Sequence, residues 1–300
     1  MITIDSQQIE NLFISPSLCV DWVTQSFRMK KDSQLPAKVS VHPAGNDFFT
    51  TMPCLLPSDK ERFGVKVVSR ILGRTPSLSS DILLYNSANG ELLALINADW
   101  ITSMRTGAVA TVAIKTLRSS SARKYSFIGL GNTARATLLC LLSSFPDEIF
   151  QVVLFRYKDQ AEYFIDYFRT FGNVVFSVVD TMEELVEDAD VLVSCITDAD
   201  GLLIGNDALF KPGILLVPVH TRGFQNCDLF FDKVFADDTE HVRSFQYFNQ
   251  FKRFNEIGDV LDGTCRGREN DKERILSYNI GLGLHDVFFA SNIYDMITNR

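Results

Sequence analysis

From about residue 124 onward, apolar runs of strand length alternate with amphipathic segments of helix length. The apolar runs cover residues 124–128, 151–155, 174–179, 191–196 and 214–219. Helix-length segments separate the first four runs. Near-continuous apolar strands that alternate with helices are typical of a parallel sheet covered on both faces. The pattern therefore predicts a parallel α/β region.

The chain before this region has a different pattern. Five strand-like runs are separated by turn residues, at 38–42, 48–52, 64–68, 81–85 and 92–96. Asn89-Gly90 between the last two predicts a tight hairpin, because this pair tolerates the positive φ of a type I′ turn. We therefore expect a mixed or antiparallel sheet, then a helix over 108–117 and a boundary at Ser119-Ser-Ser121. An apolar helix is expected over 281–298.

Length and composition narrow the classes of protein. The 300 residues correspond to one large domain or two ordinary ones, at roughly 150 residues each. The net charge of −8 argues against a non-specific nucleic-acid binder. We expect no membrane span and no secretion signal, because the apolar runs are too short and Met1–Ser6 lacks a basic start. The six cysteines are widely scattered, which predicts reduced thiols in a cytoplasmic protein. The four histidines are equally dispersed, so we expect no metal site.

A glycine-rich turn follows the first strand of the parallel region. Residues 127–135 read FIGLGNTAR, which places Gly129, Gly131 and Ala134 in a G-x-G-x-x-A pattern, with Asn132 and Thr133 opening the helix. Such a turn lets the backbone approach a pyrophosphate at the helix N-terminus. We predict a dinucleotide site at these five residues; the alternative is a tight strand-to-helix turn without a ligand.

The end of the second parallel strand predicts which dinucleotide binds. An acidic residue there would bind the ribose 2′-hydroxyl of NAD, but the sequence has Arg156 and Lys158 instead. These two cations favour NADP, while nearby Asp159 keeps NAD possible and a solvated basic loop is the alternative reading. Thr197, just after the fourth strand, is expected beside the cofactor from its position alone.

Several segments in the same order resemble the ornithine cyclodeaminase/mu-crystallin family. The segments are Met52-Pro-Cys54, Gly64–Val68, Thr102–Ala108, Ile257–Leu261 and Gly281–Asp286. The third is similar to the specific family signature T-x-x-R-T-A/G-A, and the glycine-rich turn follows it at the expected distance. The resemblance therefore extends over nearly the whole chain.

The resemblance implies a homodimer whose chain has two parts. Residues 1–118 would form a substrate-binding and dimerisation domain, residues 119–275 an inserted Rossmann domain, and 276–300 a helix returning to the first domain. The common reaction of the family is hydride transfer between the nicotinamide and the α-carbon of a small amino, imino or 2-oxo acid. The protein's part in such chemistry is to orient the reactants and supply charge.

The resemblance also places three cations where the substrate carboxylate binds: Lys38, Lys66 and Arg105. A planar arginine can hold a carboxylate with two hydrogen bonds, and a lysine can protonate an imine or carbonyl. Strand alternation sends Lys66 to the face opposite Val65 and Val67. The alternative for Lys66 is an ordinary solvated strand lysine.

One departure from the family concerns the loop after the fifth parallel strand. Cyclodeaminases have an aspartate there that contacts the reacting amine, and ungapped alignment puts Arg222 in its place. A cation facing a substrate ammonium would be unfavourable by several kcal/mol, to order of magnitude, in a half-buried site. Arg222 instead indicates a substrate with a second anionic group, or a loop turned outward. His220 and Asp228 are the candidate proton-transfer residues on this loop, although backbone contacts alone could explain His220.

Three functions follow as hypotheses. The first is an NAD(P)H-dependent reductase or dehydrogenase of small amino, imino or 2-oxo acids. The second is ornithine cyclodeamination to proline with bound NAD. The third is a non-catalytic NADPH-dependent binder, similar to the crystallin member of the family.

Overall fold

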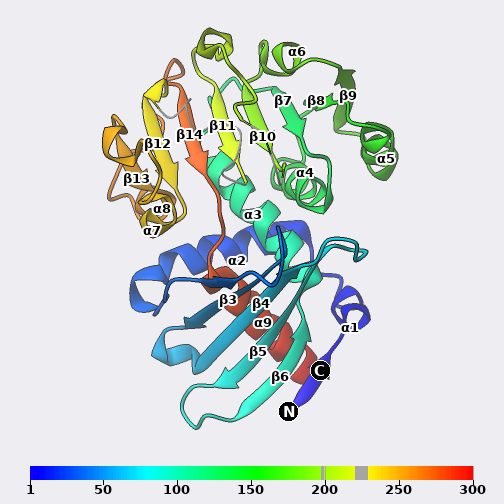
Figure 1. Cartoon of the computed structure of the whole chain (residues 1–300), viewed down its shortest axis with the longest axis vertical. Helices are drawn as coiled ribbons and strands as arrows, with labels where there is room; N and C mark the ends of the chain where they lie inside the picture. The colour runs from blue at the N-terminus through cyan, green and yellow to red at the C-terminus, as the bar shows by residue number, and fades with distance from the viewer. Residues whose placement is uncertain (197–198, 200, 220–228, 300) are drawn as a thin grey trace. The chain divides into compact units, whose positions relative to one another are not determined.

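The computed structural model describes residues 1–196, 199, 201–219 and 229–299. The chain forms two compact units, Met1–Arg105 with Gly281–Arg300, and Thr106–Ile280 (Figure 1). The first boundary falls inside helix α3 (Asp99–Leu117), whereas the sequence placed it after residue 118. The second lies after Ile280, a few residues beyond the expected position at 275. Among the described residues, no helix combines the length and the hydropathy needed to span a membrane.

The first unit contains a mixed six-stranded sheet in the order β1-β6-β5-β4-β3-β2. Its strands are β1 (Ile2–Ile4), β2 (Val39–Val41), β3 (Phe48–Leu55), β4 (Arg62–Arg70), β5 (Leu78–Asn86) and β6 (Leu92–Asn97). Only the β1–β6 pair among these strands is parallel. The helices of this unit are α1 (Ser6–Glu10), α2 (Pro16–Arg28), α9 (Gly283–Thr298) and the part of α3 that ends at Arg105, with short 3-10 turns at Lys30–Asp32 and Ser58–Lys60.

The β5–β6 hairpin is wider than the sequence predicted. Five residues separate the strands, and the Asn86 side chain accepts hydrogen bonds from the backbone N–H groups of Ala88 and Asn89. Gly90 has a positive φ of 77°, but Asn89 does not, so the turn is not type I′. The type I′ prediction was therefore wrong, because the Asn86 side chain organises a longer loop.

Helix α9 packs along one face of this sheet and also contacts α2 (Figure 1). The residues of its first two turns are buried. The approach is close: a Cβ on Gly64 of β4 would lie 2.7 Å from Val287 Cγ2. Trp22 of α2 meets Phe289 edge to face, with ring centroids 5.0 Å apart. The face of the sheet that carries Gly64 is therefore the core face of the unit.

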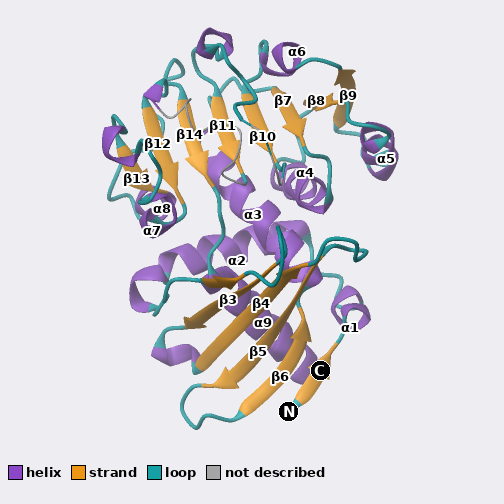
Figure 2. Ribbon diagram, in the orientation of Figure 1, coloured by secondary structure: helices purple, strands orange, loops and turns teal. Residues whose placement is uncertain are grey.

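The second unit contains an eight-stranded parallel sheet in the order β13-β12-β14-β11-β10-β7-β8-β9 (Figure 2). Its strands are β7 (Lys124–Ile128), β8 (Phe150–Phe155), β9 (Val174–Val179), β10 (Val191–Ser194), β11 (Leu215–Pro218), β12 (Lys233–Ala236), β13 (Phe254–Glu256) and β14 (Ile275–Tyr278). Its helices include α4 (Asn132–Ser144), α5 (Gln160–Tyr167), α6 (Met182–Val186), α7 (Thr239–Val242) and α8 (Ile257–Leu261), with 3-10 turns at Asp207–Leu209 and Phe248–Gln250.

This topology confirms the predicted α/β fold class. The strand order reverses between β7 and β10, which makes their carboxyl ends the switch point where ligands bind in open α/β sheets. The sequence predicted the first five parallel strands but not β12, β13 and β14. The last of these enters the sheet between β11 and β12.

Helices α3 and α4 lie so close together at Gly107 that a side chain there should lower the stability of the protein. A Cβ on Gly107 would lie 2.5 Å from the carbonyl carbon of Ala136 and from the amide nitrogen of Thr137. Gly107→Ala should therefore push the helices apart and destabilise the protein by about 1–3 kcal/mol. Urea unfolding followed by circular dichroism measures the change. Gly172→Ala is the control, because that Cβ would meet nothing within 4 Å; equal stability of the two variants would contradict the contact.

Candidate functional site

Three charged side chains meet inside the first unit. Lys66 lies on β4, Arg105 on α3 and Asp286 in the first turn of α9, and their side chains are 1%, 6% and 0% exposed. Lys66 Nζ donates to Asp286 Oδ1 at 2.8 Å, and Arg105 Nε donates to the same oxygen at 2.8 Å. Two cations therefore share one carboxylate oxygen in the core.

Strand alternation explains how Lys66 enters this core. Lys66 and Gly64 lie on the buried face of β4, while Val65 and Val67 lie on the opposite, half-exposed face. Lys66 therefore leaves the valine face, as predicted, but the face it joins is the buried one. The alternative of a solvated strand lysine was wrong, because α9 covers the lysine.

The local charges shift the pKa values of both partners. Burial lowers the pKa of the Lys66 ammonium to about 8; Arg105 and, more weakly, Lys38 add to this effect, while Asp286 opposes it. Burial raises the pKa of the Asp286 carboxyl, but the charges of Arg105 and Lys66 outweigh it and hold that pKa below its ordinary value. Lys66 can thus exchange a proton near neutral pH while Asp286 stays ionised.

The cluster has hydrogen-bonding capacity left over. Arg105 Nη1 and Asp286 Oδ2 are buried and have no hydrogen-bond partner among the described residues. The three groups carry a net charge of one positive when Lys66 is protonated. A buried guanidinium nitrogen without an acceptor is costly, and an anionic ligand would remove that cost. The arrangement therefore fits a bound carboxylate.

Gly281 makes room for the Arg105 guanidinium. A Cβ at this position would lie 1.7 Å from Arg105 Nη1, and the backbone φ of Gly281 is +91°, in the region that favours glycine. The glycine that opens the Gly281–Asp286 segment therefore lets the guanidinium lie against the backbone.

Lys38, the third predicted carboxylate ligand, is an exposed residue just before β2. Its positive charge contributes to the lowered pKa of Lys66, so the structure brings all three predicted cations into one electrostatic environment. Their role in substrate binding stays a prediction.

Asp286 is a site residue that the sequence did not single out. A signal was present, because Asp286 is the acidic residue that closes Gly281–Asp286, one of the segments that resemble the family. The neighbouring residue His285 is also buried, and its Nδ1 lies 2.7 Å from Ser26 Oγ. Ser26 Oγ also donates to the carbonyl of Val23. The contact with Ser26 holds the imidazole in place beside Asp286.

The glycine-rich turn of the second unit has the geometry of a phosphate cradle. Gly129 has a φ of +80°, and a Cβ there would lie 2.6 Å from the backbone of Cys195. Gly131 precedes α4, has no side-chain cap and would carry its Cβ in open space. Asn132 and Thr133 open the helix, and buried Ala134 keeps it close to the sheet. The free N–H groups at this end suit a pyrophosphate.

The two cations after β8 have other partners in the structure. Arg156 Nε donates to Asp180 Oδ1 at 2.8 Å, and Arg156 Nη1 donates to Glu162 Oε1 at 2.7 Å. Lys158 has a positive φ of 52°, and its Nζ lies 5.3 Å from the centre of the Tyr157 ring. The predicted preference for NADP therefore stays a prediction, now with two acidic neighbours beside Arg156.

The other predicted site residues, Thr197, His220, Arg222 and Asp228, lie outside the described residues. Within the described part of the chain, no group of three or more His, Cys, Asp and Glu side chains is arranged to hold a metal ion.

The electrostatics of the buried cluster predict an unusual lysine titration. Lys66 should titrate near pH 8, and Asp286→Asn should lower this pKa by about one unit or more, because it removes the charge that favours the ammonium. Carbon-13 NMR of the lysine Cε signals, assigned with Lys66→Arg, measures it. Asp295→Asn, on the same helix but paired with Arg62, should leave the titration unchanged. An ordinary lysine pKa in the unmodified protein would refute the cluster.

Comparison with known proteins places these features in a family. The model of the ornithine cyclodeaminase/mu-crystallin family matches residues 2–300. A Δ1-pyrroline-2-carboxylate reductase from Bacillus cereus is 27% identical over 256 residues, which cover 78% of this chain and 77% of the reductase.

The fold is shared with solved structures, among them two that contain a bound dinucleotide. A Δ1-pyrroline-2-carboxylate reductase from Thermococcus litoralis, solved with NADH and L-proline, has a TM-score of 0.89 at 23% identity. The match covers 100% of this chain and 98% of the reductase chain. An archaeal alanine dehydrogenase dimer with bound NAD has a TM-score of 0.86 at 24% identity. The match covers 99% of this chain and 96% of the dehydrogenase chain. From the family match over residues 2–300, the chain belongs to the ornithine cyclodeaminase/mu-crystallin family.

Proposed function

We propose that this protein is an NAD(P)H-dependent oxidoreductase that transfers hydride between the nicotinamide and the α-carbon of a small amino, imino or 2-oxo acid. The observation that carries this proposal is the buried Lys66–Arg105–Asp286 cluster. It has excess positive charge, and its Arg105 Nη1 has no hydrogen-bond partner among the described residues. The uncapped N-terminus of α4 supports a dinucleotide in the same chain. The Bacillus cereus relative is named as a reductase of a cyclic imino acid.

Each residue of the cluster has a distinct part in such a reaction. The dinucleotide supplies or accepts the hydride. Arg105 would hold the substrate carboxylate through its free nitrogen, and exposed Lys38 would add positive charge. Lys66, protonated below a pKa of about 8, would donate a proton to the substrate nitrogen or oxygen, or accept one in the reverse direction. Asp286 would hold both cations in place through Oδ1. His220, Arg222 and Asp228 remain further candidates.

Ornithine cyclodeamination is the second candidate, supported by family membership. That reaction needs an acceptor for the substrate amine. Asp286 Oδ1 already accepts from two cations, which leaves Oδ2 as the oxygen of this carboxylate that could take that part. Proline formation from ornithine without net oxidation of a dinucleotide would establish it. Tight dinucleotide binding without turnover of any substrate would instead favour a non-catalytic binder.

Substitutions in the cluster should separate binding from proton transfer. With NADH or NADPH and a panel of cyclic imino acids and 2-oxo acids plus ammonia, Lys66→Met should lower kcat by about 10²–10⁴. Arg105→Met should mainly raise KM, by tenfold or more, because a buried charged hydrogen bond to the carboxylate is lost.

The assay is absorbance at the nicotinamide band. Arg62→Met is the control, because Arg62 pairs with Asp295 away from the cluster. If the unmodified protein oxidises neither dinucleotide with any substrate of the panel, the proposed reaction is wrong. If Arg62→Met reduces activity as much as Lys66→Met, the assigned roles are wrong.

We also propose a cytoplasmic homodimer that forms through the outer face of the first sheet. One row of paired residues across this face is entirely apolar and only half-buried: Pro53, Val65, Leu83 and Leu95. Helix α9 packs on the opposite face. Apolar rows of this kind are typical of an interaction surface. The archaeal alanine dehydrogenase with the same fold is described as a dimer.

A charge placed in this row should disrupt the dimer. Val65→Glu should shift the protein from dimer to monomer, because it puts a carboxylate in the centre of the apolar face. Analytical ultracentrifugation measures the mass. Val175→Glu is the matched control, since Val175 is 61% exposed on β9 of the other unit. A monomeric unmodified protein, or a Val65→Glu variant that stays dimeric, would overturn the proposed interface.

A further inference from the structure

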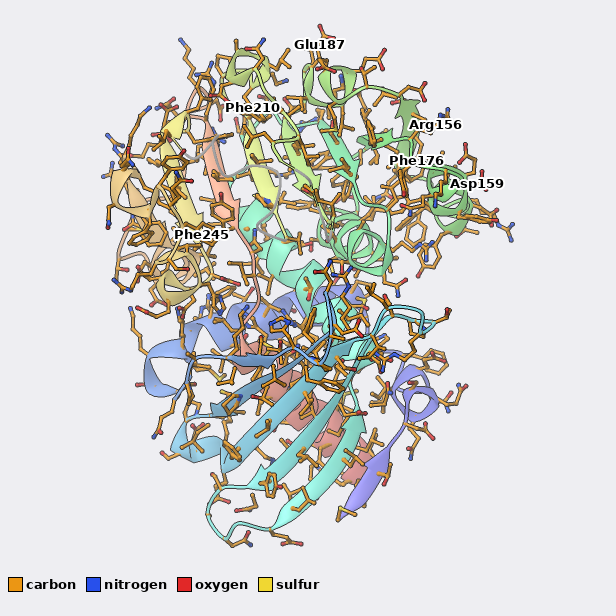
Figure 3. All side chains as sticks on the ribbon, viewed as in Figure 1. Arg156, Asp159, Phe176, Glu187, Phe210 and Phe245 are labelled. Atoms are coloured by element: carbon orange, nitrogen blue, oxygen red, sulfur yellow. The ribbon has the colours of Figure 1, made fainter. Side chains whose placement is uncertain are left out.

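Three charged side chains gather beside the carboxyl ends of β8 and β9. Arg156 directly follows β8, Asp180 directly follows β9, and Glu162 lies in the first turn of α5 (Figure 3 labels Arg156). The guanidinium binds both carboxylates, with Nε 2.8 Å from Asp180 Oδ1 and Nη1 2.7 Å from Glu162 Oε1. Nε and Nη1 thus each have an acidic partner.

The strand register places this cluster on the path of a dinucleotide. Strands β7, β8 and β9 are adjacent, Phe127 pairs with Leu154, and Leu154 pairs with Val178. The Arg156 N–H donates to the Val179 carbonyl, so the backbone stays paired to the strand ends. A dinucleotide whose pyrophosphate binds at the glycine-rich turn after β7 extends its adenosine over the end of β8. Arg156 and Asp180 would then lie beside the adenosine ribose.

The local charge favours a ribose hydroxyl over a phosphate. Arg156, Asp180 and Glu162 together carry one net negative charge. A ribose 2′-hydroxyl can donate a hydrogen bond to a carboxylate, whereas a 2′-phosphate would be repelled by the two carboxylates that bind Nε and Nη1 of Arg156. All three side chains are about half exposed or more, at 44%, 71% and 56%. Water therefore screens each interaction, and the effect on affinity is modest.

We infer that Asp180 and Glu162 are specificity-determining residues that hold Arg156 in ion pairs and shift cofactor preference toward NADH. The inference rests on the proposed function, because it requires a dinucleotide at the glycine-rich turn. It revises the simple reading of the sequence, in which Arg156 alone would select NADPH. The acidic residue that the end of β8 lacks is supplied by the end of the neighbouring strand.

Direct binding measurements test this inference without any substrate. Isothermal titration calorimetry with NADH and with NADPH would compare the unmodified protein with Asp180→Asn, Glu162→Gln and the double variant. The double variant should bind NADPH roughly three to tenfold more tightly, because two like charges beside the phosphate are removed. NADH affinity should stay the same or fall. Adding Arg156→Ala to the double variant should abolish the gain for NADPH.

A carboxylate elsewhere in the second unit provides a matched control for the binding measurements. Glu187→Gln removes an exposed carboxylate of the same unit that is not joined to Arg156, and it should change neither affinity. Equal changes for NADH and NADPH, or no change in the double variant, would overturn the inference while leaving dinucleotide binding intact. Failure of the unmodified protein to bind either dinucleotide would instead refute the proposed function, and the inference with it.

Discussion

A single carboxylate oxygen joins three parts of the first unit that are far apart in the sequence. Asp286 Oδ1 accepts from Lys66 on β4 and from Arg105 on α3, while Asp286 itself belongs to α9. Because all three side chains are buried, loss of Asp286 would leave two uncompensated cations in the core, at a cost of about 3–5 kcal/mol. The same interaction therefore fixes the helix on the sheet and holds the two cations together.

Small residues make this arrangement possible. Gly64 allows α9 to approach β4 at Val287, Gly283 lies against the backbone of Met52, and Gly281 leaves space for the Arg105 guanidinium. A side chain at any of these positions would displace the helix or the arginine. The glycines and the charged groups thus form one structural feature, in which close packing determines where the charges lie.

The proposed function needs an anion site in each unit, and the two units would supply these sites by different means. In the first unit, side-chain cations lie in a low-dielectric core, where a bound carboxylate would stabilise the excess positive charge. In the second, the N–H groups in the first turn of α4, which has no side-chain cap at Gly131, would bind phosphate oxygens. Hydride transfer between a dinucleotide and a substrate that carries a carboxylate would need both anion sites, so the proposed function depends on both units.

The sequence by itself determined the features that depend on neighbouring residues. The parallel region, the glycine-rich turn at Gly129 and the direction of Lys66 all follow from local periodicity and backbone conformation. Tertiary structure alone decided the rest. Asp286 binds Arg105, which lies 181 positions earlier in the sequence. Asp180 binds Arg156 at the ends of the adjacent strands β9 and β8, and β14 enters the sheet beside β11. Such contacts depend on which elements pack together in space, and local patterns of hydrophobic and polar residues do not encode that choice.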